Sequence, residues 1–121
     1  MKNRNLRSSF SHAFNGIIQA FKTERNVKLH TMFGLLAILF GVYFKISVLE
    51  WLIIVLTIGF VIVAELLNTA IEYTVDMVCG KTYNELAKYS KDIAAGATLV
   101  AAIVAIIIGG IIFMPKLLSI L

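Results

Sequence analysis

Three long runs of the chain contain no Asp, Glu, Lys or Arg, and they limit the folds open to it: Leu29–Phe44, Trp51–Ala64 and Ile93–Pro115. The third run is long enough to cross a bilayer alone. The first two reach the required length of about 20 residues if their helices extend into the flanking sequence. The chain is 60% apolar and 15% charged, far from the composition of a typical soluble domain. We therefore predict an all-α membrane protein rather than a soluble one.

The predicted organisation is a single domain over residues 1–121, with transmembrane helices at roughly 26–45, 49–77 and 92–118. The first two spans are joined by the short segment "KISVLEW", so they must be antiparallel neighbours. Small residues recur at four-residue intervals in the third span, which lets helices approach closely and indicates a contact in a bundle or an oligomer. They are Ala97, Ala101, Ala105 and Gly109.

Basic residues predict the orientation of the spans. Nine lie in the N-terminal segment or the 78–91 loop, and only Lys45 and Lys116 lie on the other side. The nine are Lys2, Arg4, Arg7, Lys22, Arg25, Lys28, Lys81, Lys88 and Lys91. The N-terminus and the 78–91 loop are therefore expected in the cytoplasm and the C-terminus outside. The net charge of +4 indicates topology and attraction to anionic lipid, not nucleic-acid binding.

An amphipathic helix is predicted before the first span, over about residues 8–24. Its apolar side chains fall on one face at i, i+4, i+7, i+8 and i+11. They are Phe10, Phe14, Ile17, Ile18 and Phe21. Such a helix is expected to lie in the headgroup layer before the chain enters the membrane.

The second span continues into "AELLNTAIEYTVD", where Glu65, Asn68, Glu72 and Asp76 share one helical arc of about 80°. Glu65 lies about 21 Å along the helix from Trp51, hence in the inner half of the apolar layer. Ionisable residues at such depths are usually functional. The alternative is a polar seam that only joins helices, but unpaired carboxylates repel one another and so hold helices together poorly.

Repulsion among these carboxylates favours a divalent cation or cationic side chains nearby. Hard oxygen ligands suit Mg²⁺, which normally arrives with phosphate and several waters. Glu24 can reach the same inner layer as Glu72, and Lys88 and Lys91 in the following loop supply positive charge. The "CGKT" segment at 79–82 imitates the end of a P-loop. It lacks the earlier glycine, since position 75 is Val75, and a preceding strand, so we reject it.

The segment "AELLNTAIEYTVD" carries a polar stripe, formed by Glu65, Asn68, Glu72 and Asp76. This segment, followed by "AKYSKDIAAGATLVAAI", resembles the signature of the small integral-membrane bacterial diacylglycerol kinases, which include the Gram-positive undecaprenol kinases. The similarity covers nearly the whole chain, including "KTERN" before the first span. His30 stands where the Gram-negative diacylglycerol kinases are acidic, and the loop after Asp76 is one residue longer. These differences favour the undecaprenol kinase branch. As a residue by itself, His30 is expected to line a helix interface rather than to act in catalysis.

The resemblance implies a homotrimer in the bacterial plasma membrane that uses MgATP to phosphorylate a lipid hydroxyl. Glu65 then matches the general base and Asn68 the residue that positions it. Glu24 and Glu72 match the metal ligands. The nucleotide-binding positions are Asp76, Lys91 and Asp92, with Lys88 beside them.

The expected acceptor is undecaprenol, with diacylglycerol as the alternative. A small proton- or cation-coupled transporter using Glu65 is the competing class, and a structural subunit with a polar seam is a third. A transporter needs one buried carboxylate but has no use for Glu24, Asp76, Lys91 and Asp92 together on the inner face.

Overall fold

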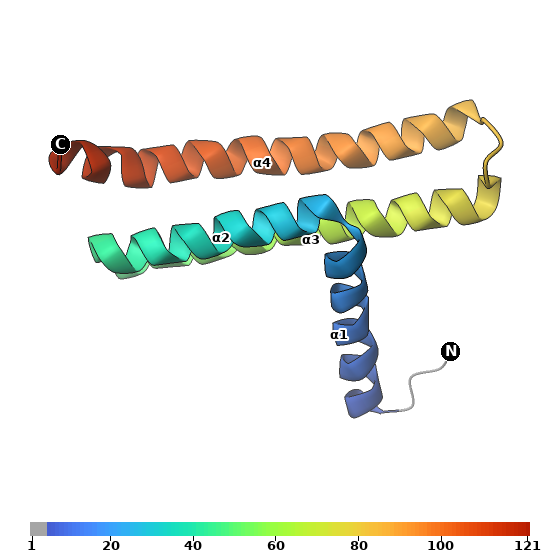
Figure 1. Ribbon diagram of the computed structural model, residues 1–121, viewed down its shortest axis with the longest axis horizontal. Coiled ribbons are helices and arrows are strands. Elements are labelled where there is room, and N and C mark those ends of the chain that lie inside the picture. Colours follow the sequence, from blue (N-terminus) through green and yellow to red (C-terminus); the bar gives the residue numbers. More distant parts are fainter. Residues whose placement is uncertain (1–4) are drawn as a thin grey trace.

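The computed structural model describes residues 5–121, which form four helices joined by short connections (Figure 1). They are α1 (Leu6–Thr23), α2 (Arg25–Phe44), α3 (Val48–Cys79) and α4 (Glu85–Ser119). The prediction of an all-α chain is confirmed. Of the basic residues assigned to the inner side, Lys2 and Arg4 lie outside the described residues.

Local side-chain chemistry explains where the long helices begin. Ser47 forms a capping box with Glu50 at the start of α3, in which each side chain binds the other residue's backbone N–H. Asn84 caps α4 by accepting a hydrogen bond from the backbone N–H of Ala87. Lys45 ends α2 in the left-handed conformation, with a φ of 50°, and so turns the chain back on itself.

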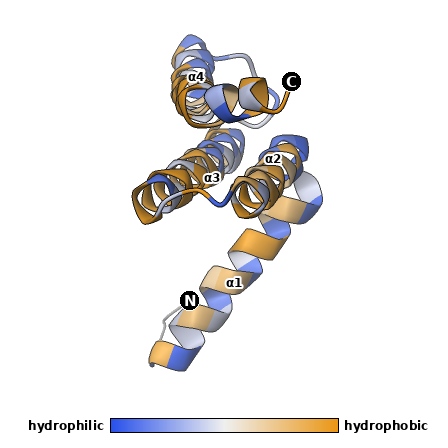
Figure 2. Ribbon diagram, turned by 90° about the vertical axis from the view of Figure 1, so that its left-hand side faces the viewer, coloured by the Kyte–Doolittle hydropathy of each residue, from blue (hydrophilic) through white to orange (hydrophobic). Residues whose placement is uncertain are grey.

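The three long helices lie side by side and run antiparallel in succession, with α3 in contact with both α2 and α4 (Figures 1 and 2). Their buried cluster sits near the α2–α3 turn and consists of Ile46, Ile54, Ile112 and Phe113. At the same end, Lys116 Nζ lies 2.7 Å from Glu50 Oε2 and ties the end of α4 to the start of α3. The helix α1 leaves this bundle crosswise, and Glu24 alone connects it to α2.

Two glycines set how closely α2 approaches α3. A Cβ on Gly34 would lie 3.1 Å from Ile58, and one on Gly41 would lie 2.7 Å from the ring of Trp51. Neither contact leaves room for a larger side chain. Because these residues are seven positions apart on α2, they mark one face of that helix, about two turns in length.

The helices α2, α3 and α4 are each long and apolar enough, by length and composition, to cross a membrane, so the chain has three candidate spans, as expected, and is a membrane protein. Many large apolar side chains on them are exposed, as expected where lipid replaces water. Figure 2 shows how much of the ribbon of these helices is hydrophobic. The helix α3 has 32 residues, about 48 Å, so it extends beyond the hydrocarbon layer of about 30 Å. Its last turns are therefore available to water-soluble ligands.

The connection between α3 and α4, at the end of the bundle that we label the inner end, is shorter than the expected 78–91 loop. Only residues 80–84 lie outside the helices, and α4 begins at Glu85. The expectation that Lys88 and Lys91 lie in a loop was wrong. The cap at Asn84 starts the helix early and places both lysines on its first turns, where their positions relative to α3 are fixed.

Candidate active site

The polar stripe on α3 passes from a buried to an exposed environment toward the inner end. Glu65 and Asn68 are buried, Glu72 is partly buried and Asp76 is exposed. All four belong to one uninterrupted helix, so their common face follows from the 3.6-residue period alone. The stripe thus connects the interior of the bundle with the end of α3.

Asn68 is hydrogen-bonded on one side only. Its Nδ2 donates to Glu72 Oε1 at 2.9 Å, whereas its Oδ1 is buried without a hydrogen-bond partner among the described residues. Buried polar atoms in proteins are nearly always paired, so an open acceptor at this position is unusual. Asn68 therefore holds the Glu72 carboxylate, and its hydrogen bond goes to Glu72 rather than to Glu65, the residue that it was expected to position.

Glu65 contacts a residue that the sequence did not assign to the site. His30 Nε2 lies 3.2 Å from Glu65 Oε1, joining α2 to α3 within the bundle. His30 also lines an apolar pocket, so the expected role at a helix interface describes only part of its environment. One sequence signal was present: His30 lies four residues before Gly34, so it falls on the glycine-bearing face of α2.

Glu24 lies at the sharp turn between α1 and α2, where the backbone is extended and its carboxylate makes no capping hydrogen bond. The adjacent Thr23 hydroxyl is 3.1 Å from the Tyr73 hydroxyl on α3, which brings the turn beside Glu72. Both Glu24 and Glu72 are close enough to Glu65 to interact with it electrostatically. These contacts place the turn and the stripe in one acidic region.

This acidic region suits Mg²⁺ bound together with phosphate. No group of three His, Cys, Asp or Glu side chains in residues 5–121 could hold a metal ion alone. Magnesium, however, usually takes one or two carboxylates and fills its remaining positions with phosphate oxygens and water. Glu24 and Glu72 are candidates for such a pair, because neither carboxylate is engaged in an ion pair with a basic side chain in the described part of the chain.

The four residues expected at the nucleotide form two ion pairs at the inner end. Lys91 Nζ lies 2.6 Å from Asp76 Oδ1 and links α4 to α3, while Lys88 Nζ lies 2.6 Å from Asp92 Oδ2 within α4. All four side chains are at least partly exposed to solvent, so each pair contributes little to stability. A phosphate group could therefore displace either carboxylate from its lysine at little cost.

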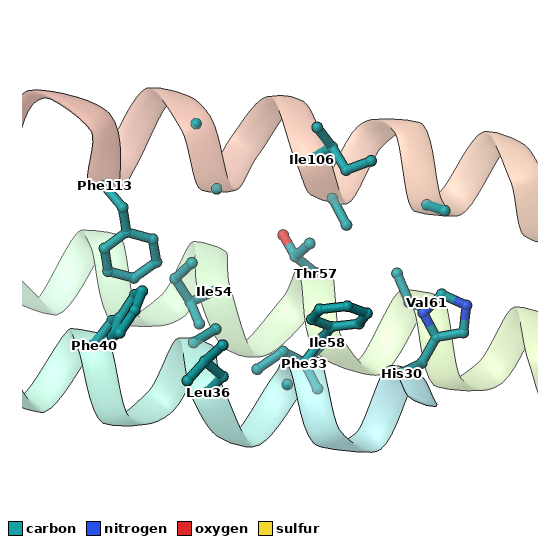
Figure 3. A pocket seen from close by; sticks show the side chains of 16 residues that line it. His30, Phe33, Leu36, Phe40, Ile54, Thr57, Ile58, Val61, Ile106 and Phe113 are labelled. Carbon is teal, nitrogen blue, oxygen red and sulfur yellow. The ribbon is translucent and has the colours of Figure 1, made fainter. Parts of the chain in front are cut away.

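An apolar pocket of about 450 Å³ runs between α2, α3 and α4 (Figure 3). Phe40 and Phe113 stand at one end, with ring centroids 5.9 Å apart, and His30 stands at the other near Val61. Among the lining residues Thr57 is also polar, but its hydroxyl already donates to the carbonyl of Ile53. The pocket is therefore suited to an apolar chain whose polar end lies at His30.

Comparison with known proteins gives the same family throughout. Residues 11–113 match the family described as prokaryotic diacylglycerol kinase. The undecaprenol kinase of Bacillus subtilis is 47% identical over 90% of this chain and 88% of its own length. A diacylglycerol kinase of Synechocystis is 44% identical over 97% of this chain and 67% of its own length. The diacylglycerol kinase of Escherichia coli K12 is 29% identical over 79% of this chain and 78% of its own length.

Proposed function

The chain belongs to the prokaryotic diacylglycerol kinase family, and we propose that it transfers the γ-phosphoryl group of ATP to the hydroxyl of undecaprenol. Family membership makes it a lipid kinase of the membrane that uses ATP. The observation that carries the choice of site is the meeting of a buried carboxylate stripe with an apolar pocket. There, a water-soluble and a lipid-soluble reactant can react with each other.

Undecaprenol is favoured over diacylglycerol for two reasons. The Bacillus subtilis relative named undecaprenol kinase is nearly the length of this chain and matches it at the higher identity of the two closely similar relatives. The pocket also offers one polar end, at His30, and otherwise apolar walls. A single hydroxyl on a long hydrocarbon matches that arrangement, whereas the two ester groups of diacylglycerol would lie against apolar side chains.

In the proposed mechanism, Glu65 is part of the set of side chains that accepts the proton of the lipid hydroxyl. Asn68 holds the neighbouring Glu72 carboxylate in place. The alcohol O–H bond breaks, its oxygen bonds the γ-phosphorus, and the bond between that phosphorus and the β–γ bridging oxygen breaks to release ADP. Lys88 and Lys91 exchange their carboxylate partners for phosphate oxygens, while Asp76 and Asp92 contact the rest of the nucleotide.

Glu24 and Glu72 would hold Mg²⁺ at the phosphates. The ion would neutralise charge that develops on the transferring group and its leaving oxygen. Both carboxylates lie at the inner end of the stripe, beside the Thr23–Tyr73 contact. The buried Glu65, which is paired with His30 at 3.2 Å, is thereby not needed as a metal ligand.

The acceptor can be identified by direct competition. Purified protein in lipid is given labelled ATP and equal mole fractions of undecaprenol and diacylglycerol, and the two lipid phosphates are separated. We expect undecaprenyl phosphate to form faster. A higher kcat/KM for diacylglycerol would assign the chain the diacylglycerol activity instead.

We also propose that the protein is a homotrimer with α1 lying on the inner membrane surface. The apolar side chains of α1 are exposed, including Phe10, Phe14 and Ile17, so this helix needs a lipid or protein surface to cover them. The trimer rests on the family resemblance, because the small-residue stripe of α4 is partly used within the chain: Ala101 is fully buried. Cross-linking in liposomes should yield a product of three chains, and a dimer as the largest product would contradict this.

The inner end of the bundle should face the cytoplasm, since ATP is cytoplasmic and the basic residues gather there. Asn84 and Ser47 cap helices, so the test cysteines are best placed at Tyr83→Cys and Val48→Cys, both 77% exposed, in a Cys79→Ser background. In intact cells, an impermeant thiol reagent should modify position 48 and spare position 83. Modification of position 83 from outside would mean that the stripe opens toward a compartment without ATP, and this would exclude the kinase orientation.

A further inference from the structure

We infer that His30, rather than Glu65, is the group that takes the proton from the lipid hydroxyl, and that Glu65 positions His30 from behind. This inference rests on the proposed function and assigns the proton-accepting atom within the same site. It starts from one contact, His30 Nε2 to Glu65 Oε1 at 3.2 Å, and from the position of both residues relative to the apolar pocket.

The two side chains differ in their access to the pocket. His30 is 21% exposed and lines the pocket, whereas Glu65 is 3% exposed and does not line it. Figure 3 shows the imidazole at the end of the pocket near Val61, one helical turn before Glu65 on α3. An alcohol whose chain lies in the pocket therefore meets the imidazole first. Glu65 lies beside Nε2 of that ring, 3.2 Å away, and does not line the pocket.

The hydrogen-bonding inventory of the two groups fixes the direction of the proton. When Glu65 is ionised, its carboxylate only accepts, so Nε2 then carries the hydrogen that lies between His30 and Glu65. This leaves the lone pair of Nδ1 as the free basic atom. As the alcohol oxygen bonds the γ-phosphorus, its proton passes to Nδ1 and the ring becomes an imidazolium. The Glu65 carboxylate then stabilises that cation by a charge-assisted hydrogen bond.

The surroundings give His30 no competing partner at the pocket. Among the lining residues within 5–121, none besides His30 is ionisable, and α4 contributes apolar side chains such as Ala102, Ala105 and Ile106. Besides His30, Glu65 interacts electrostatically with Glu72 on the same helix and with Glu24 at the α1–α2 turn. The proposed function assigns both of these carboxylates to Mg²⁺, so Glu65 is the carboxylate that stabilises the protonated ring.

The distinguishing variants are His30→Gln and His30→Ala. Glutamine can still donate a hydrogen bond to Glu65 but cannot take a proton, so we expect kcat to fall by about 10²–10⁴-fold while the KM for ATP is unchanged. In His30→Ala, added imidazole should restore kcat saturably, substituted imidazoles should do so in the order of their basicity, and pyrrole, a non-basic ring of the same size, should not. Imidazole should have no effect on Glu65→Gln, which keeps its own ring.

Wild-type protein in the same lipid mixture provides the reference for both levels of the hypothesis. If the wild type phosphorylates undecaprenol and His30→Gln keeps a near-normal kcat, Glu65 takes the proton directly and the inference is wrong, although the function stands. Loss in both His30 variants with no response to any basic ring also overturns it, because His30 is then structural. If the wild type phosphorylates neither alcohol, the function and the inference fail together.

Discussion

Replacing Glu65 by Gln is expected to lower kcat for lipid phosphorylation by about 10²–10⁴-fold, the range typical of losing a general base. The amide keeps the shape of the side chain in its buried position but carries no charge. It can neither accept a proton nor stabilise a protonated His30 3.2 Å away. Assembly and ATP binding should be preserved, since Glu65 lies deeper in the bundle than the pairs of Lys88 and Lys91. Initial rates at saturating ATP measure the effect.

Glu50 provides a matched control on the same helix. It is the carboxylate at the opposite end of α3, paired with Lys116 at 2.7 Å and remote from the stripe. Glu50→Gln should leave kcat unchanged and lower only the thermal stability of the protein. Near-normal turnover in Glu65→Gln would remove Glu65 from the mechanism, whatever the behaviour of the control.

Glu24 and Glu72 are expected to act as a unit. Changing either to Gln should sharply raise the Mg²⁺ and ATP concentrations needed for half-maximal rate, because each would remove one of two carboxylates from the ion. The double variant should lose much less than the product of the two single effects, since groups that serve one site are strongly non-additive. Magnesium titrations of all four proteins, the wild type included, give the required comparison.

Additive losses would indicate that the two glutamates serve separate sites. The contact between Thr23 and Tyr73 offers a structural control: Tyr73→Phe removes its 3.1 Å hydrogen bond without touching a carboxylate. This variant should raise the Mg²⁺ concentration needed for half-maximal rate only slightly, because a single exposed hydrogen bond contributes about 0.5–1.5 kcal/mol. A loss as large as that of Glu72→Gln would mean that the position of the turn, rather than its carboxylate, controls the metal.

Much of the fold could be predicted because the bilayer imposes simple rules. Hydropathy located the spans, and the 100° rotation per residue placed Glu65, Asn68, Glu72 and Asp76 on one face of α3. Both depend on local sequence alone. The early start of α4 had a local signal as well, since Asn84 followed by Glu85 is a typical helix start. The expected start was placed later because it was taken from the beginning of the apolar run.

Contacts between helices were harder to predict. The pairing of His30 with Glu65 and of Lys91 with Asp76 depends on the register of one helix against another, which follows from packing rather than from periodicity. Close approach at Gly34 and Gly41 helps to set that register for α2. A sequence shows that small residues permit such an approach but not which partner fills it. For the same reason, the small-residue stripe that contains Ala101 did not show whether it packs within one chain or between chains of an oligomer.

The competing interpretation as a cation-coupled transporter makes a different demand on the buried carboxylate. A transporter would use Glu65 to carry charge across the membrane without any acceptor alcohol. The pocket beside His30 and the lysine–aspartate pairs at the inner end would then have no function. The two classes are distinguished by their requirements: a lipid kinase consumes ATP and an alcohol, whereas a transporter moves ions across the membrane without either.

The most direct measurement is therefore the stoichiometry of the reaction in sealed proteoliposomes, with ADP, lipid phosphate and internal pH followed together. A lipid kinase should form no ADP until undecaprenol is added, and then one ADP for each undecaprenyl phosphate. The proton of the alcohol is released on the side that holds ATP, and no proton should cross the membrane. Proton movement across the membrane without alcohol, or ADP formed without lipid phosphate, would contradict phosphoryl transfer to a membrane alcohol at this site.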